Sequence, residues 1–140
     1  MELRIFREAK TRLPGKKIQA LFNLVVAREA KPQWRGDVNL IITTDQKIRI
    51  LNHRYRGQDK PTDVLSFTID DPVREGGTFG EIYISAPTAR RQADQHRVSL
   101  IDEYLRLVCH GLLHLFGYDH KRASESARMK ERAATLLAEL

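Results

Sequence analysis

The chain has a single cysteine, Cys109, among its 140 residues. One cysteine excludes an internal disulfide, so the fold must be held by a hydrophobic core, and a chain of this length can bury one. No stretch approaches the roughly 18 consecutive apolar residues that a membrane-spanning helix needs, and the opening sequence MELRIFREAK lacks the apolar segment of a secretory signal. These absences predict a soluble, cytoplasmic protein without a membrane partner.

Internal repeats and low-complexity tracts are also missing, and glycine and proline are scattered, so residues 1–140 are expected to form one domain. Acidic residues are the scarcer charged class: 18 Asp and Glu stand against 24 Lys and Arg, which gives a net charge of +6. Such an excess favours polyanionic partners, because neutralising phosphates releases their counterions. Charge alone does not separate a nucleic-acid-binding protein from one that is merely basic.

The spacing of apolar residues predicts an α+β fold, with a mixed sheet of about four strands packed with about five helices. The expected strands cover residues 2–6, 37–43, 64–67 and 80–85, the last two paired as a hairpin across a mobile, polar loop at 70–77. The expected helices cover residues 13–28, 45–56, 86–96, 100–116 and 123–138. The second helix carries the apolar residues Ile48, Leu51 and Tyr55. The core stripe of the last helix is expected to contain Ala127, Ala133, Leu136, Leu137 and Leu140.

Residues 110–120 read HGLLHLFGYDH and place His110, His114 and His120 at the spacing of a three-histidine metal site. Residues four apart share one face of a helix, so the first two histidines can point at one cation. Gly117 can take a left-handed conformation, which lets the chain reverse and return His120 as the third ligand. We therefore predict a metal site on this helix, whose several apolar sides indicate a central, buried position.

The same spacing, HxxxHxxGxxH, is found in the metzincin zinc proteases, but Gly111 stands where those enzymes carry a catalytic glutamate. Peptide hydrolysis by the usual route is therefore disfavoured. Three protein ligands leave a coordination position open for water or substrate, which is typical of catalytic zinc and not of structural zinc. Cys109 lies about 100° round the helix from His110, so we expect it to face the core instead of the metal.

A second polar cluster, NHRYRGQDKPTDVLSF, covers residues 52–67. Arg56 ends the second expected helix just before Gly57, and its planar guanidinium can place two donors on a phosphate. Two interpretations stay open from position alone: stabilisation of a phosphoryl transition state, or complementation of the negative end of the helix. Asp63 and its polar neighbours are likewise typical of turns and caps.

Together these motifs resemble the YbeY family of metal-dependent endoribonucleases over nearly the whole chain. The resemblance rests on HGLLHLFGYDH, on YRGQDKPTDVLSF at 55–67, and on GEIYIS at 80–85, where Glu81 replaces the family's aspartate. It implies zinc held by the three histidines, a functional arginine at Arg56, and a mixed sheet packed with helices. It also implies single-strand-selective cleavage of RNA, with the ribosome as partner, in maturation of the 3′ end of small-subunit ribosomal RNA and in ribosome quality control.

The proton acceptor is not assigned by these motifs. Asp63 and Asp119 are candidates by charge, and Asp119 could instead orient a ligand histidine. His53 and His96 are expected at the surface, and Glu103, on the helix face of the first metal histidine, is expected to be solvated. Two rival functions also fit: a metal hydrolase of another substrate class, and a ribosome-assembly RNA-binding protein with a structural zinc. The native metal, the nucleophile (water or a 2′-hydroxyl) and the oligomeric state stay undetermined.

Overall fold

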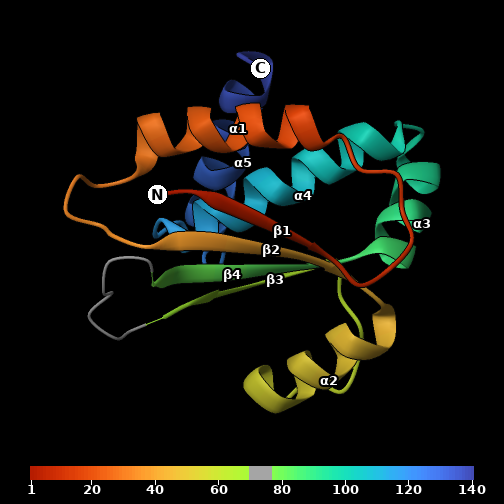
Figure 1. The fold of residues 1–140 in the computed structure, drawn as a ribbon. Coiled ribbons are helices and arrows are strands. Elements are labelled where there is room, and N and C mark those ends of the chain that lie inside the picture. Colours follow the sequence, from red (N-terminus) through yellow and green to blue (C-terminus); the bar gives the residue numbers. More distant parts are fainter. Residues whose placement is uncertain (70–76) are drawn as a thin grey trace.

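The structure, a computed structural model, describes residues 1–69 and 77–140 and contains a four-stranded mixed sheet (Figure 1). Its strands, in the spatial order β1-β2-β4-β3, are β1 (Leu3–Arg7), β2 (Asp37–Thr43), β3 (Val64–Thr68) and β4 (Thr78–Ser85). β1, β2 and β4 run parallel, while β3 pairs antiparallel with β4 at the sheet edge. The predicted α+β class and the pairing of the last two strands are confirmed. Residues 70–76 of the predicted loop lie outside the described residues.

The described residues form five helices: α1 (Gly15–Glu29), α2 (Asp45–Arg56), α3 (Ala86–His96), α4 (Leu100–Leu115) and α5 (Ala123–Ala138). Figure 1 shows α1, α4 and α5 on one side of the sheet and α2 on the other. Three helices start where the sequence signals a cap, because a side-chain oxygen accepts a first-turn N–H at Thr44, Ser85 and Ser99. Among the described helices, none is both long enough and apolar enough to cross a membrane.

The central element is α4, as its apolar sides predicted. Tyr104, Leu107, Val108 and Leu112 are fully buried, and α4 contacts β3, β4, α1, α3 and α5. Cys109 is also fully buried, which confirms that it faces the core. Each large apolar side chain removed from water contributes about 1.5–3 kcal/mol, so the helix that carries two histidines of the predicted metal site is firmly held.

Two glycines let α4 lie very close to the sheet. A Cβ added to Gly111 of α4 would lie 2.7 Å from Ile82 Cγ2 of β4, and a Cβ added to Gly80 of β4 would lie 2.7 Å from Leu115 Cδ2 of α4. Neither position has room for a side chain in this packing. The Ser66 hydroxyl of β3 donates a hydrogen bond to the Gly111 carbonyl oxygen at 3.2 Å. Both strands therefore hold the helix at the same point.

Two residues predicted for the core stripe of the last helix are exposed instead. In the last part of the chain, Ala127 and Leu140 are exposed, and Met129 is buried in their place. The described contacts of α5 are with α4 and α1, so its buried stripe is narrower than its apolar pattern. The apolar residue Tyr55, near the end of α2, is 60% exposed, and its ring centroid lies 5.3 Å from that of Phe67 on β3.

Candidate metal centre

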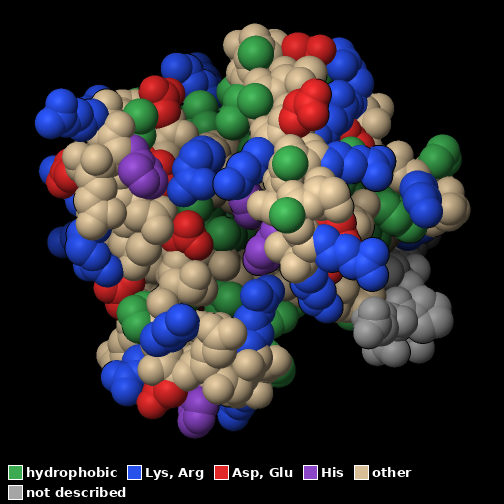
Figure 2. All heavy atoms as spheres, turned by 180° about the vertical axis from the view of Figure 1, so that it is seen from behind, with side chains coloured by type: hydrophobic (Ala, Val, Ile, Leu, Met, Phe, Trp, Pro, Cys, Tyr) green, Lys and Arg blue, Asp and Glu red, His purple; other side chains and the backbone are tan. Residues whose placement is uncertain are grey.

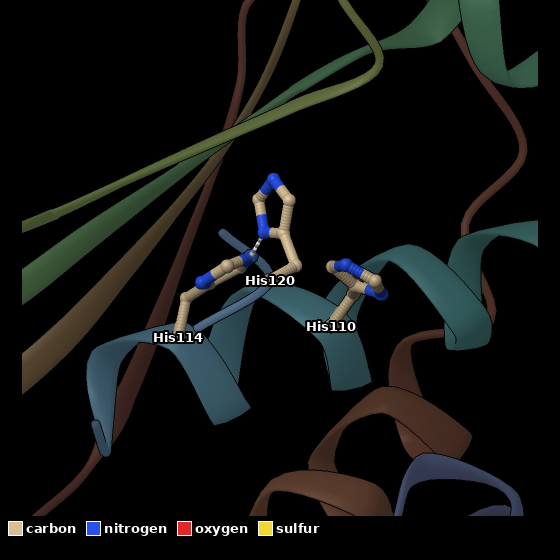
Figure 3. A group of neighbouring side chains, drawn as sticks. All are labelled: His110, His114 and His120. Atoms are coloured by element: carbon tan, nitrogen blue, oxygen red, sulfur yellow. Dashed lines mark hydrogen bonds between the residues drawn. The ribbon is translucent and has the colours of Figure 1, made fainter. Parts of the chain in front are cut away.

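The helix α4 places two histidines on one face. His110 and His114 lie one turn apart, and their ring centroids are separated by 5.2 Å. Both side chains are partly buried. Figure 3 shows the two rings on the same side of α4, with the ring of His120 above the helix beside them.

The chain reverses just after α4 at Gly117, whose φ is +102°. The N–H groups of Gly117 and Tyr118 close the helix by donating to carbonyl oxygens of its last turn, at 3.1 and 2.9 Å. The turn brings His120 back to the helix, where its ring centroid lies 4.8 Å from that of His114 and 6.4 Å from that of His110. The structure therefore brings together the three histidines that the sequence motif singled out.

These histidines, which we call the triad, meet the geometric requirement of a metal site. Their candidate ligand nitrogens all lie within 4.8 Å of one another, and His120 Nδ1 lies 3.1 Å from His114 Nε2 (Figure 3). Two nitrogens on one tetrahedral zinc ion are about 3.3 Å apart, given zinc–nitrogen bonds of about 2.0–2.1 Å. His114 Nδ1 bonds the Tyr118 carbonyl oxygen at 3.0 Å, which leaves Nε2 for the centre. The triad could therefore hold a metal ion.

Burial also keeps His110 and His114 in the form that binds metals. Burial, together with the neighbouring His114 and Arg106, lowers the pKa of His110 to about 4. Burial likewise lowers the pKa of His114, with His120 adding to the shift. Neutral imidazole is the ligand form of histidine, so these two side chains are ready to coordinate at neutral pH.

The triad lines a cavity of about 160 Å³. The remaining lining residues come from the second polar cluster and from α4: Arg56, Thr62, Asp63, Val64, Ser66 and Arg106. Arg56 reaches the triad because α2 ends at Gly57, whose φ is +69°. The buried Asn52 side chain fastens the segment that follows by donating to the Lys60 carbonyl oxygen at 2.8 Å. The two motifs of the sequence thus meet in one cavity.

Residues 5–140 match a family model described as Endoribonuclease YbeY. The chain belongs to the YbeY family. The YbeY protein of Anaeromyxobacter sp. (strain Fw109-5) is 42% identical over 101 residues, which cover 72% of this chain and 53% of that protein. The YbeY protein of Moorella thermoacetica is 40% identical over 136 residues, which cover 89% of this chain and 87% of that protein.

Several YbeY relatives are matched over only part of their own length. The matched part of the chain spans 53%, 62% and 62% of three of these relatives.

Among solved structures, the solution structure of a Thermotoga maritima protein superposes with a TM-score of 0.60 at 30% identity, covering 98% of this chain and 90% of that one. The fold is therefore shared over nearly the whole chain.

In this YbeY chain, Arg106 is a cavity residue that the sequence motifs did not reveal. It lies one helical turn before the first triad histidine. Its guanidinium donates to Glu103 Oε1 at 2.6 Å and to Gln92 Oε1 at 3.3 Å, and Nη2 lies 3.8 Å from Asp63 Oδ2. The sequence feature that could have pointed to Arg106 is the Glu-x-x-Arg spacing on the helix face that carries the first histidine.

Glu103 corrects the prediction of a solvated carboxylate, because it is only 1% exposed. The prediction assumed that its helix face was open, whereas packing of α4 within the fold covers it. A buried carboxylate needs hydrogen bonds and a countercharge, and Arg106 supplies both. The hydrogen bond to Glu103 in turn raises the pKa of Arg106, so this YbeY cavity has a fixed arginine at its edge.

The two aspartates that were candidates by charge occupy different places in the YbeY site. Asp63 lines the triad cavity, and its Oδ1 accepts the N–H of the next residue at 2.8 Å. Asp119 lines an adjoining hollow. Its Oδ1 accepts the backbone N–H of His120 at 2.7 Å, which lowers the pKa of Asp119, so it fastens the backbone of the third histidine and not its ring. His53 and His96 are exposed, as predicted.

Proposed function

We propose that this YbeY family chain is a metal-dependent, single-strand-specific endoribonuclease that processes ribosomal RNA, including the 3′ end of small-subunit RNA, and acts in ribosome quality control. The observation that carries the proposal is one cavity lined by both the histidine triad and Arg56. A metal site beside a permanent cation suits hydrolysis of a phosphodiester, in which negative charge builds on phosphoryl oxygens. The name of the relatives, Endoribonuclease YbeY, supports this substrate class.

The proposed metal ligands are His110, His114 and His120, and the proposed ion is Zn²⁺. When bound, the metal would polarise a phosphoryl oxygen and lower the pKa of a water molecule from about 15.7 towards about 7. Three imidazoles are ligands that zinc and several other divalent transition metals accept. The triad supplies three ligands, which leaves room for water or substrate, as catalytic zinc sites do.

Arg56 is the proposed catalytic arginine. Its guanidinium is always protonated and can donate two parallel hydrogen bonds to two oxygens of the scissile phosphate. Within the described ranges, no carboxylate lies at ion-pairing distance from Arg56. Its charge is therefore available to the substrate, which favours the catalytic interpretation over simple complementation of the helix end.

We propose Asp63 as the proton acceptor that Gly111 cannot be. The backbone N–H of Val64 holds Asp63 Oδ1 at 2.8 Å, which leaves Oδ2 to accept a proton from the attacking oxygen. Arg106 lies 3.8 Å from that oxygen and is itself held by the buried Glu103. In this assignment Asp63 is catalytic, whereas Arg106 is a positioning residue that acts through it.

The proposed partners are single-stranded ribosomal RNA and the small ribosomal subunit that presents it. Figure 2 shows histidine side chains deep in the middle of one face, with Lys and Arg side chains on several sides of them. These positive charges attract a phosphate backbone without regard to its base sequence. We propose, in keeping with this substrate, that the protein acts in the cytoplasm, where ribosomes assemble, and that residues 1–140 form one domain.

The proposal is tested by RNA cleavage with metal-loaded protein on structured ribosomal RNA that carries single-stranded tails. His114→Ala is expected to abolish cleavage, and Arg56→Ala to slow it about 100-fold or more. The matched control is Arg54→Ala, which removes an exposed arginine from the same helix and should cut like the wild type. If Arg56→Ala and His114→Ala both cut like this control, the proposed function is wrong.

Two further outcomes would point to another function. Cleavage of casein or amide substrates without cleavage of RNA would indicate a hydrolase of another class. Unfolding of His114→Ala, detected by circular dichroism, together with undiminished RNA binding by Arg56→Ala, would indicate a structural metal in an RNA-binding protein.

A further inference from the structure

Three hollows on the surface share lining residues in a way that joins them into one groove. The first is the triad cavity of about 160 Å³. A second, of about 260 Å³, shares Arg56, Ser66 and His114 with it. A third, of about 370 Å³, shares Gly117, Tyr118 and Asp119 with the second and no lining residue with the first. The second hollow therefore lies between the other two, and the groove continues past the triad along the turn after α4.

A fixed aromatic ring lies where the second and third hollows meet. The Tyr118 hydroxyl donates a hydrogen bond to Glu29 Oε2 of α1 at 3.0 Å, which fixes the side chain. The guanidinium carbon of Arg128, an exposed residue of α5, lies 5.8 Å from the centre of the Tyr118 ring. Aromatic rings and arginine planes are the two surfaces on which unpaired RNA bases stack.

The charges in the third hollow also favour a phosphate. Its two acidic residues have cations nearby: Glu125 lies 3.6 Å from Arg122, and Asp119 lies 4.0 Å from Lys121. Arg128 has no carboxylate at ion-pairing distance among the residues of the described ranges. Arg56 lines the second hollow beside the triad, and Arg128 lines the third. Both arginines thus lack an ion-pair partner among the described residues.

We infer that the third hollow is a second nucleotide site, which binds a nucleotide of the same RNA strand away from the bond that is cut. The base stacks against the surface formed by Tyr118 and Arg128, and Arg128 pairs with the adjoining phosphate. The inference rests on the proposed function, since it assumes that the triad cavity takes single-stranded RNA. It explains strand selectivity, because the bases of a duplex are already stacked and paired and cannot offer a free face to the protein.

The test is the length dependence of RNA binding and cleavage. Fluorescence anisotropy with chelator-treated protein gives the Kd of a labelled dinucleotide and of a labelled octanucleotide, and cleavage by the metal-loaded protein gives the KM of short and long substrates. Arg128→Ala is expected to weaken octanucleotide binding about fivefold or more and to raise the KM of long substrates, with dinucleotide binding and kcat unchanged. The slope of log Kd against log salt should fall by about 0.7, the loss of one phosphate contact on a single strand.

Two variants separate a nucleotide site from a general charge effect. Lys130→Ala removes an exposed cation from the same helix, two residues away and outside the three hollows, and should leave Kd and KM within twofold of wild type. Arg128→Lys keeps the charge but not the plane, so it should restore the salt slope and only part of the affinity. If Arg128→Ala shows the same length dependence as Lys130→Ala in binding and in KM, this inference fails while the proposed function stands. If wild-type protein neither binds nor cuts single-stranded RNA, the proposed function itself fails.

Discussion

Replacing Arg106 with alanine should reveal how strongly the buried carboxylate of Glu103 depends on it. Glu103 is 1% exposed and accepts two hydrogen bonds from Arg106, from Nη2 at 2.6 Å and from Nε at 3.3 Å. Arg106→Ala removes both bonds and the neighbouring positive charge. The carboxylate would then keep its burial without the partner that makes the burial tolerable.

The expected loss follows from the exposure of the two groups. Removing one partner of a buried ion pair costs about 3–5 kcal/mol. The Arg106 side chain is 40% exposed, so solvent already screens part of its charge, and we expect Arg106→Ala to lower the free energy of unfolding by about 2–3 kcal/mol. Glu103→Gln keeps the shape of the side chain but removes its charge. The double variant Glu103→Gln/Arg106→Ala should therefore be more stable than Arg106→Ala alone, by about 1 kcal/mol or more.

The assay is urea unfolding at pH 7, monitored by far-ultraviolet circular dichroism. The urea midpoints of the variants are compared where the slope of unfolding free energy against urea is the same. The control is Arg49→Ala, which breaks the ion pair between Arg49 and Asp59. The side chains of this pair are 57% and 58% exposed. Its urea midpoint should match that of the wild type. If Arg106→Ala unfolds at the midpoint of this control, or if the double variant is the least stable of the set, the reasoning about Glu103 is refuted.

Three further predictions concern other parts of the molecule. Burial opposes ionisation of Asp45, but hydrogen bonds from α3 and its cap prevail and hold its pKa below the usual 3.8. Asp45→Asn should thus cost about 1 kcal/mol at neutral pH, and the difference should disappear as the pH falls through that lowered pKa in acid unfolding curves. Gly111→Ala should lower the thermal midpoint by several degrees, because overpacking against Ile82 costs about 1–3 kcal/mol and outweighs a helix-propensity gain of about 1 kcal/mol; an unchanged or higher midpoint would contradict the packing. Burial raises the pKa of the Cys109 thiol to about 12, so a thiol reagent should label it rapidly only in unfolding concentrations of urea.

The features that were predictable from the sequence are those that local spacing decides. The triad follows from a four-residue helical spacing and a glycine turn, so His110, His114 and His120 could be brought together without knowledge of the rest of the chain. The placement of helix starts at Thr44 and Ser99 is equally local, because the capping oxygen and the N–H that it accepts belong to the same turn.

The features that were missed depend on tertiary packing. From the sequence, Glu103 is expected to be an exposed helix carboxylate, because the elements that cover this face of α4 are not yet known. The role of Arg106 likewise becomes visible only in the structure, where Asp63 lies beside it. Likewise, the apolar pattern of α5 does not show how much of the helix its neighbours cover, so Met129 replaced Ala127 in the core. Apolar periodicity gives the direction of a buried face, and its width comes from the partner elements.

The close fit between α4 and β4 couples the side chains that positions 82 and 111 can accept. Ile82 occupies the space that a side chain at position 111 would need, and Leu115 occupies the space beside Gly80. A glutamate at position 111 would become tolerable only after the strand had changed, and a smaller residue at position 82 would leave a void while Gly111 remained. Because the two residues share one contact, we expect the two substitutions together to cost less than the sum of their separate costs. Placing the glutamate of the zinc proteases at position 111 of this chain would therefore need a second change in β4.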